Sequence, residues 1–336
     1  MKKILLPTLD YVPQTGGVAR YIHAINETLP EVHVSYWKGH SAHPLVTFFR
    51  LLKEGVGYKA IWVHHLFPLG MAAYLVNKVT RKPYTVFLHG MDFDLARRTE
   101  IRAWIAKHIL KSAKNVVTNT NALKGEVDAF AGVEALVVHP VVDDGLVEAS
   151  KVKIAAHRRH EDVVLLTVAR LVSRKGHEAV LRMLSGLQGI RYHIVGDGAE
   201  RAYLAELVEE LGLEDRVEMQ QSVSDKKLAD LYRQTDIFIM PTKKTVTDRE
   251  GFGIVYLEAQ LFGVPVIATN HPGVDEALVD GVSGLLVKDD AMQLKHAVKK
   301  LAKDPDLRKR MGRAGREFVL AGFTRAAEMK KLRAIL

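Results

Sequence analysis

Two basic residues follow an apolar run in the second half of the chain. Arg170 comes directly after the run Val163–Ala169, and Lys175 lies five residues further on. A planar guanidinium and a flexible ammonium in one loop can hold a diphosphate from two sides. The alternative is that both are solvated side chains of a surface loop. Spacing alone leaves both interpretations open.

Two carboxylates flank a second candidate segment. Glu250 precedes Phe252 and Gly253, and Glu258 lies within the apolar helix that follows. Glycine before a helix exposes the first backbone amides to a phosphate, and a carboxylate within the helix can accept hydrogen bonds from sugar hydroxyls. A carboxylate among apolar residues is costly unless it is bonded. The alternative is that Glu250 only complements the helix dipole and Glu258 is structural.

A pair of glycines lies in the loop after the first apolar run. Gly16 and Gly17 stand between a predicted strand, Lys3–Leu9, and a predicted helix, Gly17–Leu29. Such glycines let the backbone approach an anion closely and direct unpaired amides toward it. The same pair also serves as an ordinary turn. No G-x-G-x-x-G motif follows either early strand, so the dinucleotide-binding fingerprint is missing.

His89 and Asp92 follow the predicted strand Tyr84–Leu88. Binding residues are expected at such a carboxyl strand end. Asp92 and Asp94 also form a D-x-D pair, a pattern found in some metal sites, but we expect no metal ion here. The remaining histidines lack the spacing of metal ligands and are expected to be mostly structural, among them His64, His65, His139 and His271.

Short aliphatic and β-branched runs alternate with helical patterns, which predicts parallel α/β sheets buried on both faces. The alternation stops from about 143 to 160, a predicted linker, and then begins again. The predicted strands are Lys3–Leu9, Ala60–His64, Tyr84–Leu88, Asn115–Thr118, Val163–Ala169, Tyr192–Val195, Val217–Gln220, Ile237–Met240, Pro265–Ala268 and Gly284–Val287. The predicted helices are Gly17–Leu29, Leu69–Val79, Ile101–Lys111, His177–Leu187, Ala199–Leu211, Lys226–Gln234 and Gly253–Phe262.

Length and composition narrow the class of protein. A chain of 336 residues with 48% hydrophobic content is too long for one ordinary core, so we predict two domains. The absence of cysteine excludes a disulfide framework, a thiolate metal site and a cysteine nucleophile, and it fits a reducing cytoplasm. Asp10 interrupts the apolar start before a signal peptide develops, and the longest mainly apolar run, Leu66–Val76, is too short to span a bilayer.

Positive charge is concentrated in the first part of the chain. Of a net charge of +9, residues 1–140 hold 17 Lys and Arg against 10 Asp and Glu, whereas residues 141–336 hold 31 against 29. The segments His43–Lys59 and Ala96–Lys114 mix apolar and basic residues, as in helices that lie in a membrane interface. The alternative is an ordinary helix with a solvated basic face. No nucleic-acid-binding pattern is present, so we expect no nucleic acid partner.

Taken together and in this order, these segments resemble glycosyltransferase family 4, retaining enzymes of the GT-B fold. That fold is an α/β architecture of two Rossmann-like, doubly wound parallel-sheet domains facing a cleft. The resemblance spans nearly the whole chain. It is carried by Gly16-Gly17-Val18, His89-Gly90, Val168-Ala169-Arg170 with Lys175-Gly176, Val195-Gly196-Asp197-Gly198, Glu250-Gly251-Phe252-Gly253 with Glu258, and Pro272-Gly273-Val274 with Glu276.

The resemblance implies a division of labour between domains. Residues 1–150 would form the acceptor-side domain, and residues 151–324 would bind the nucleotide-sugar donor. A C-terminal helix over residues 325–336 would pack back onto the first domain.

The resemblance also implies roles for residues of the second domain. Arg170 and Lys175 would bind the donor diphosphate and stabilise the leaving nucleotide as negative charge develops. Glu258 would hold the ribose hydroxyls. Glu250 and the backbone of Phe252 and Gly253 would position the donor sugar, and Gly196 belongs to the same donor-binding set.

Residues of the first domain receive roles on the same basis. Gly17 would bring a backbone amide to the donor phosphate, and Gly16 belongs to the same donor-binding set. His89 would contact the donor sugar. Asp92 is a candidate residue on the acceptor side. Neither a cofactor nor a metal ion is expected, since the nucleotide sugar is itself a substrate.

The implied function is transfer of a hexose from a nucleotide-diphosphate sugar to a glycan, lipid-linked or glycolipid acceptor, in cell-envelope polysaccharide or glycolipid synthesis. The stretch from Arg249 to Glu258 is similar to lipid mannosyltransferases, which favours GDP-mannose narrowly over UDP-hexoses. The expected location is the cytoplasm, peripheral on the inner face of the cell membrane. Two alternatives stay open: a sugar-nucleotide epimerase of the same fold, and a non-catalytic module that binds nucleotide sugars.

Overall fold

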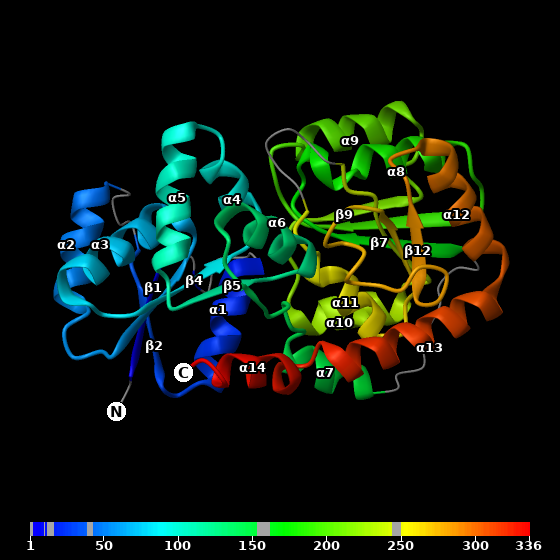
Figure 1. The fold of residues 1–336 in the computed structure, drawn as a ribbon. Coiled ribbons are helices and arrows are strands. Elements are labelled where there is room, and N and C mark those ends of the chain that lie inside the picture. Colours follow the sequence, from blue (N-terminus) through cyan, green and yellow to red (C-terminus); the bar gives the residue numbers. More distant parts are fainter. Residues whose placement is uncertain (1–2, 10, 12–16, 39–42, 153–161, 244–249) are drawn as a thin grey trace. The chain divides into compact units, whose positions relative to one another are not determined.

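The computed structural model describes residues 3–9, 11, 17–38, 43–152, 162–243 and 250–336. It divides the chain into unit 1, residues 1–141 and 325–336, and unit 2, residues 142–324. Within the described residues, each unit contains a six-stranded sheet in which every pairing of strands is parallel (Figure 1). The α/β architecture predicted from the alternation of strands and helices is confirmed.

Unit 1 has the strand order β2-β1-β3-β4-β5-β6. Its strands are β1 (Ile4–Thr8), β2 (Val32–Tyr36), β3 (Ala60–His64), β4 (Tyr84–Leu88), β5 (Asn115–Thr118) and β6 (Leu136–Val137). Its helices are α1 (Gly17–Thr28), α2 (Pro44–Glu54), α3 (Met71–Thr80), α4 (Met91–Ala96), α5 (Glu100–Ser112), α6 (Asn121–Ala131) and α14 (Arg325–Arg333), with a single turn η1 (Leu66–Gly70) before α3.

The strands of unit 1 bury both faces of the sheet. Leu5 and Val63 pack with residues of α2, α3 and α5, whereas Leu6 and Trp62 pack with residues of α1 and α14 on the other face. Successive strand side chains point to opposite faces, so a strand covered on both sides must be apolar throughout. This is why these strands read as continuous apolar runs.

Unit 2 has the strand order β12-β11-β10-β7-β8-β9. Its strands are β7 (Val163–Val168), β8 (Ile190–Val195), β9 (Val217–Gln220), β10 (Ile237–Met240), β11 (Val266–Thr269) and β12 (Gly284–Val287). Its helices are α7 (Asp144–Lys151), α8 (His177–Ser185), α9 (Arg201–Glu210), α10 (Asp225–Gln234), α11 (Ile254–Leu261), α12 (Ala291–Lys303) and α13 (Pro305–Gly322), with a short turn η2 (Ser173–Lys175) after β7.

Unit 2 also buries both faces, with α8 and α9 on one side of the sheet and α10 and α11 on the other (Figure 1). Its strand order is that of dinucleotide-binding sheets: β8 and β9 follow β7 on one side, and β10, β11 and β12 lie on the other, so the strand order reverses between β7 and β10. In unit 1 the reversal falls between β1 and β3. Ligands of such sheets bind outside the carboxyl ends of the strands at these reversals. The loops after β7 and β10 are therefore where a ligand of unit 2 is expected.

The chain divides nine residues before the predicted end of the first domain at residue 150. The reason is α7, which packs against α10 and α11 and buries Leu146 in a core of unit 2. Residues 153–161, the remainder of the predicted linker, lie outside the described part. Residues 325–336 group with unit 1, because α14 packs on α1 and buries Met329 and Leu332 there.

Candidate functional site

The loop after β7 carries three basic side chains with different surroundings. Arg170 is exposed, whereas Arg174 and Lys175 on η2 are each only 8% exposed. Gly176 ends the turn with a φ of 77°, and a Cβ there would lie 2.1 Å from the carbonyl oxygen of Pro241. Only glycine therefore permits this loop to approach the chain just after β10 so closely.

Glu250 receives both buried cations. Its Oε2 accepts a hydrogen bond from Arg174 Nη1 at 2.6 Å and another from Lys175 Nζ. The exposed fractions of the Arg174, Lys175 and Glu250 side chains are 9%, 10% and 12%. The loops after β7 and β10 thus meet in an ion cluster at the reversal of strand order. Of the two residues predicted to hold a diphosphate, Lys175 is bound to Glu250 and Arg170 faces solvent.

The cluster shifts the pKa of both Lys175 and Glu250 downward. Burial is the largest influence on the pKa of Lys175, and the Arg174 and Arg170 charges lower it further against the opposing effect of Glu250. Burial by itself raises the pKa of Glu250, but Lys175 and Arg174 outweigh it, so the net pKa is below the ordinary value. Burial therefore lowers the pKa of Lys175 and the two cations lower the pKa of Glu250, so both partners shift in the same direction.

Buried polar side chains support the loop from beneath. His177 is 1% exposed; its Nδ1 lies 3.3 Å from the Tyr192 hydroxyl, and its Nε2 lies 3.4 Å from the carbonyl oxygen of Arg170. The Tyr192 hydroxyl donates to Thr167 Oγ1 at 2.8 Å. Burial lowers the pKa of His177 to about 4, so this ring is neutral at physiological pH. The network fixes the backbone from which Arg170 projects.

Glu258 lies on α11, deep in unit 2. The residue is only 1% exposed, and its Oε2 accepts a hydrogen bond from the Tyr232 hydroxyl at 2.9 Å. Phe252 is also buried, and Gly253 precedes α11 with a φ of 82°. A Cβ at Gly253 would lie 2.4 Å from the Tyr256 ring, so local packing requires glycine there. Glu258 therefore has the bonded partner that its apolar surroundings demand.

Gly196 follows β8 and has a packing role. Its φ is 149°, and a Cβ would lie 1.9 Å from the carbonyl oxygen of Ala169, just before Arg170. The backbone N–H of Gly196 donates to the carbonyl of Gln220 at 2.9 Å. The glycine thus keeps the ends of β7, β8 and β9 close together, independently of its predicted role in donor binding.

In unit 1 the structure brings His89 and Asp92 together. Asp92 Oδ1 accepts a hydrogen bond from the backbone N–H of His89 at 3.0 Å, and Asp92 Oδ2 lies 3.7 Å from His65 Nδ1. Burial raises the pKa of Asp92, but its bonds and charges toward His65 and His89 hold the net pKa below the ordinary value. Both residues lie at the carboxyl end of β4, as predicted.

His64 is a further member of this group. Its Nδ1 lies 2.8 Å from His89 Nε2, and the two rings stack with centroids 5.1 Å apart. Burial, followed by the charges of His89 and His65, keeps the pKa of His64 well below its ordinary range. His64 is thus a neutral ring that supports His89. His139 has a structural partner as expected, since its backbone N–H and its ring contact Glu328 on α14.

The predicted glycine pair is described only in part. Gly17 opens α1 and is exposed, and a Cβ there would meet no non-neighbouring atom of the described residues within 4 Å. Packing against this part of the chain therefore does not require glycine at this position. Gly16 lies outside the described residues. Across the chain, then, the structure joins Lys175 to Glu250 in unit 2 and His89 to Asp92 in unit 1.

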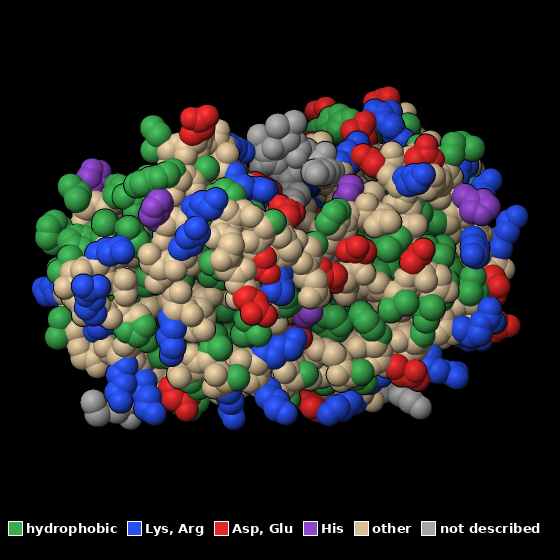
Figure 2. Space-filling view, viewed as in Figure 1, with side chains coloured by type: hydrophobic (Ala, Val, Ile, Leu, Met, Phe, Trp, Pro, Cys, Tyr) green, Lys and Arg blue, Asp and Glu red, His purple; other side chains and the backbone are tan. Residues whose placement is uncertain are grey.

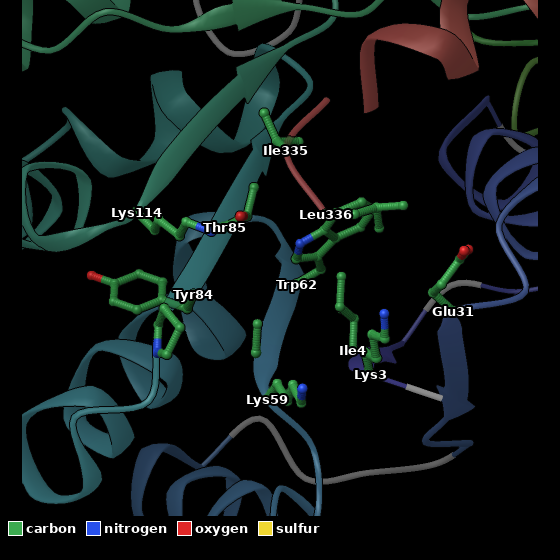
Figure 3. A pocket seen from close by; sticks show the side chains of 12 residues that line it. Lys3, Ile4, Glu31, Lys59, Trp62, Tyr84, Thr85, Lys114, Ile335 and Leu336 are labelled. Carbon is green, nitrogen blue, oxygen red and sulfur yellow. The ribbon is translucent and has the colours of Figure 1, made fainter. Parts of the chain in front are cut away.

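A pocket of about 380 Å³ opens in unit 1 at the amino ends of β1, β3 and β4 (Figure 3). It lies at the other end of these strands from His89 and Asp92, which follow the carboxyl end of β4. None of the predicted site residues lines it, because those residues follow the carboxyl ends of strands. Its lining comprises Lys3, Ile4, Glu31, Lys59, Ala60, Trp62, Pro83, Tyr84, Thr85, Lys114, Ile335 and Leu336.

The described ranges contain neither a metal-binding cluster nor a membrane-spanning helix. No group of three or more His, Asp or Glu side chains there is arranged to hold a metal ion, and the pair Asp92 and Asp94 belongs to no such group. No helix in those ranges combines the length and the apolar character needed to cross a membrane.

Two residues of these sites, Arg174 and Tyr232, were missed by sequence reasoning, and His64 was expected to be structural without its contact to His89. Arg174 was visible one position before Lys175, but nothing in a run of basic residues tells which of them turns inward. His64 ends β3, which pairs with β4, the strand that precedes His89. The predicted strands therefore place the two histidines near each other, but they do not predict that the rings touch. Tyr232 lies 26 residues before Glu258, and no local pattern connects the two.

Comparison with known families covers almost the whole chain. The model for "Glycosyl transferases group 1" matches residues 150–318, and that for "Glycosyl transferase 4-like domain" matches residues 14–142. A GDP-mannose-dependent alpha-(1-6)-phosphatidylinositol monomannoside mannosyltransferase from Mycolicibacterium smegmatis is 26% identical over 98% of this chain and 97% of its own length.

Solved structures share the fold at low sequence identity. Sucrose-phosphate synthase from Thermosynechococcus elongatus superposes with a TM-score of 0.80 at 22% identity, covering 100% of this chain and 98% of its own. Anabaena HepE in complex with UDP superposes with a TM-score of 0.83 at 18% identity, covering 99% of each chain. Because the group 1 model alone matches half of the sequence, the chain belongs to the group 1 glycosyl transferases and is a glycosyltransferase of family 4 type with the GT-B fold.

Proposed function

We propose that this glycosyltransferase transfers a hexose from a nucleotide-diphosphate sugar to a glycan or lipid-linked acceptor, with retention of anomeric configuration and without a metal ion. GDP-mannose is the preferred donor of the proposal, and UDP-hexoses are the second choice. Unit 2 binds the donor and unit 1 binds the acceptor. The product would belong to a cell-envelope polysaccharide or glycolipid.

The observation that carries the proposal is the ion cluster at the reversal of strand order in unit 2. Lys175 and Arg174 bind Glu250 there, and the exposed Arg170 lies in the same loop after β7. Cations held at this edge are suited to the diphosphate of the donor, and they stabilise the negative charge that develops on the leaving nucleotide. Glu258 on the following helix is the proposed ribose ligand, and Glu250 the proposed ligand of the donor sugar.

The two nucleotide choices draw on different relatives. The mannosyltransferase that is 26% identical over nearly the full length is named as GDP-mannose-dependent. Anabaena HepE, which shares the fold at 18% identity, was solved with UDP and with UDP-glucose. The sequence match along the whole chain is the reason that GDP-mannose stands first.

The acceptor side of the proposal includes a membrane surface. Phe49 and Leu45 on α2 are 62% and 59% exposed, and Trp104 and Ile101 on α5 are 63% and 74% exposed. Lys and Arg side chains lie among hydrophobic ones on the face of unit 1 shown in Figure 2. Exposed aromatic and aliphatic side chains among cations match the composition of an anionic lipid surface. We propose that α2 and α5 dock there on the inner face of the cell membrane.

A nucleotide panel followed by turnover tests the proposal. Melting temperatures are measured with GDP, UDP and ADP, since a ligand that binds only the native state raises the apparent stability. The nucleotide that gives the largest shift selects the sugar donors for turnover with lipid and glycan extracts. Product anomer is read by NMR, and EDTA treatment tests for a metal requirement. We expect GDP to shift most, a retained anomer, and undiminished activity in EDTA.

Three outcomes would contradict the proposed function. Isomerised sugar from donor incubated alone would indicate an epimerase. Unchanged biological activity of Glu250→Ala and Lys175→Ala would indicate a binding module without catalysis. The absence of any shift with all three nucleotides would remove the donor site from unit 2.

A further inference from the structure

Glu250 is held by two cations through a single oxygen. Arg174 Nη1 donates to Glu250 Oε2 at 2.6 Å, and Lys175 Nζ contacts the same oxygen. All three side chains are at most 12% exposed. A carboxylate buried to this degree is costly unless an opposite charge and hydrogen bonds remain with it.

This arrangement creates a competition for Lys175. The proposed function requires its ammonium to bind the donor diphosphate, yet here the ammonium binds Glu250. If Lys175 were the only cation on Glu250, binding the diphosphate would weaken its hold on the carboxylate. Arg174 removes that conflict, because its guanidinium stays on Glu250 when the ammonium turns away.

The charges of Arg170, Arg174, Lys175 and Glu250 are consistent with Arg174 holding Glu250 while Lys175 binds the diphosphate. Arg174 and Glu250 together are neutral, and Arg170 and Lys175 then remain as two positive charges. A nucleotide sugar carries two negative charges on its diphosphate at neutral pH, one on each phosphorus. Complementary charge of this kind is worth most where water is excluded.

We infer that Arg174 is a positioning residue that holds Glu250 and thereby releases Lys175 to bind the donor diphosphate. The inference rests on the proposed function and adds a residue that acts through another. Arg174 is anchored for this task, since its backbone carbonyl accepts a hydrogen bond from the N–H of Lys243 at 2.7 Å, just beyond β10. Its side chain is inside the cluster, unlike that of Arg170.

Calorimetric titration of Arg174→Met with UDP and GDP tests the inference. Without the guanidinium, Glu250 keeps Lys175, so the affinity for the diphosphate that the wild type prefers should fall about tenfold, the size expected for one charge-assisted contact. The affinity for the matching nucleoside, measured by competition, should not change. Arg174→Lys retains a cation at this position and should lose less.

The double variant Arg174→Met/Glu250→Gln separates positioning from a structural role. Removing the negative charge of Glu250 frees Lys175 again, so diphosphate affinity should return to within about threefold of wild type. A damaged loop would not be repaired by a second substitution in the cluster. Arg182→Met is the matched control, because Arg182 forms an exposed pair with Glu178 on α8 and should bind as wild type.

Three results would overturn the inference. Undiminished diphosphate affinity of Arg174→Met would show that Lys175 needs no release. A double variant as weak as Arg174→Met would show that Arg174 acts on the diphosphate or on folding; Arg174→Gln provides a second test if the methionine variant melts early. Wild type that binds neither UDP nor GDP would instead overturn the proposed function, and this inference with it.

Discussion

Gly196 and Gly17 were both predicted to bind the donor, yet their surroundings differ. A Cβ at Gly196 would lie 1.9 Å from the carbonyl oxygen of Ala169, whereas a Cβ at Gly17 would meet no non-neighbouring atom of the described residues within 4 Å. Gly196 is thus required by the packing of unit 2 whether or not a ligand binds. Packing against the described residues makes no such demand at Gly17, so donor binding by this glycine stays a prediction.

Alanine substitutions separate these two roles. Gly196→Ala forces both a clash and an unfavourable φ, so we expect unit 2 to lose at least about 2 kcal/mol of unfolding free energy. Gly17→Ala should leave stability within about 1 kcal/mol of wild type, because alanine suits a helix, while nucleotide affinity falls about tenfold. Urea unfolding and calorimetric titration are the measurements. A Gly17→Ala protein that binds nucleotide normally would make Gly17 a turn residue only.

The ion cluster shows how far residue types alone predict a site. Lys175 and Glu250 were both identified as candidates, and parallel-sheet topology predicts that loops after neighbouring strands meet. Their direct ion pair was not predicted, since it depends on which way the short turn η2 faces. The same uncertainty hid Arg174. Local spacing predicts the region of a site, while side-chain direction follows from packing.

At the scale of elements, α14 is joined to unit 1 by a buried carboxylate. Glu328 is 2% exposed; it accepts hydrogen bonds from the backbone N–H of His139 at 3.0 Å and from Lys331 at 2.7 Å. Burial raises the pKa of Glu328, but the bonds from His139 and Lys331 and their charges hold the net pKa below the ordinary value. The ionised form is therefore favoured in the folded state.

This pKa shift predicts a pH-dependent stability. A carboxyl group whose pKa is lower in the folded state stabilises the fold above its unfolded pKa, and the stabilisation disappears as the pH falls through the folded pKa. Glu328→Gln should cost about 2 kcal/mol at pH 7, and the difference from wild type should shrink below about pH 4. Urea unfolding at both pH values measures it, with the exposed Glu317→Gln as control. A cost independent of pH would contradict an electrostatic role.

The exposed apolar residues of α2 and α5 give a second prediction at this scale. Replacing Phe49 and Trp104 with Ser removes aromatic area from the proposed membrane face while keeping every charge. We expect the double variant to bind anionic vesicles at least about tenfold less than wild type in flotation. Met292→Ser is the control, because Met292 is 74% exposed but lies in unit 2. Wild-type protein that stays at the bottom of the gradient would contradict membrane docking.

Elements differed in how well the sequence predicted them. The central strands were predicted nearly to the residue, because burial on both faces makes them continuous apolar runs. Strand β2 was missed, since it is at the edge of its sheet and alternates apolar residues with His33 and Ser35. Helices α12 and α13 were missed too; they are rich in Lys and Arg, so a narrow apolar stripe carries their periodicity.

At the scale of the whole molecule, the repeated sheet architecture explains why separate weak motifs belong together. Each unit reverses its strand order once, and the predicted residues of that unit follow strands at or beside the reversal. The one-dimensional pattern predicted both sheets and a first domain that ends at residue 150, whereas the contacts group residues 142–150 with unit 2. Helix α7 has too few apolar residues for its partner to be read from sequence, and its packing against α10 and α11 decides the boundary.

The proposed function depends most on the binding of the donor diphosphate by Lys175. Calorimetric titration of wild type and Lys175→Met with GDP and UDP tests it most directly. We expect wild type to bind at least one of them and Lys175→Met, folded by circular dichroism, to bind it at least about tenfold more weakly. Equal affinities in the two proteins, or a wild type that binds neither nucleotide, would contradict it.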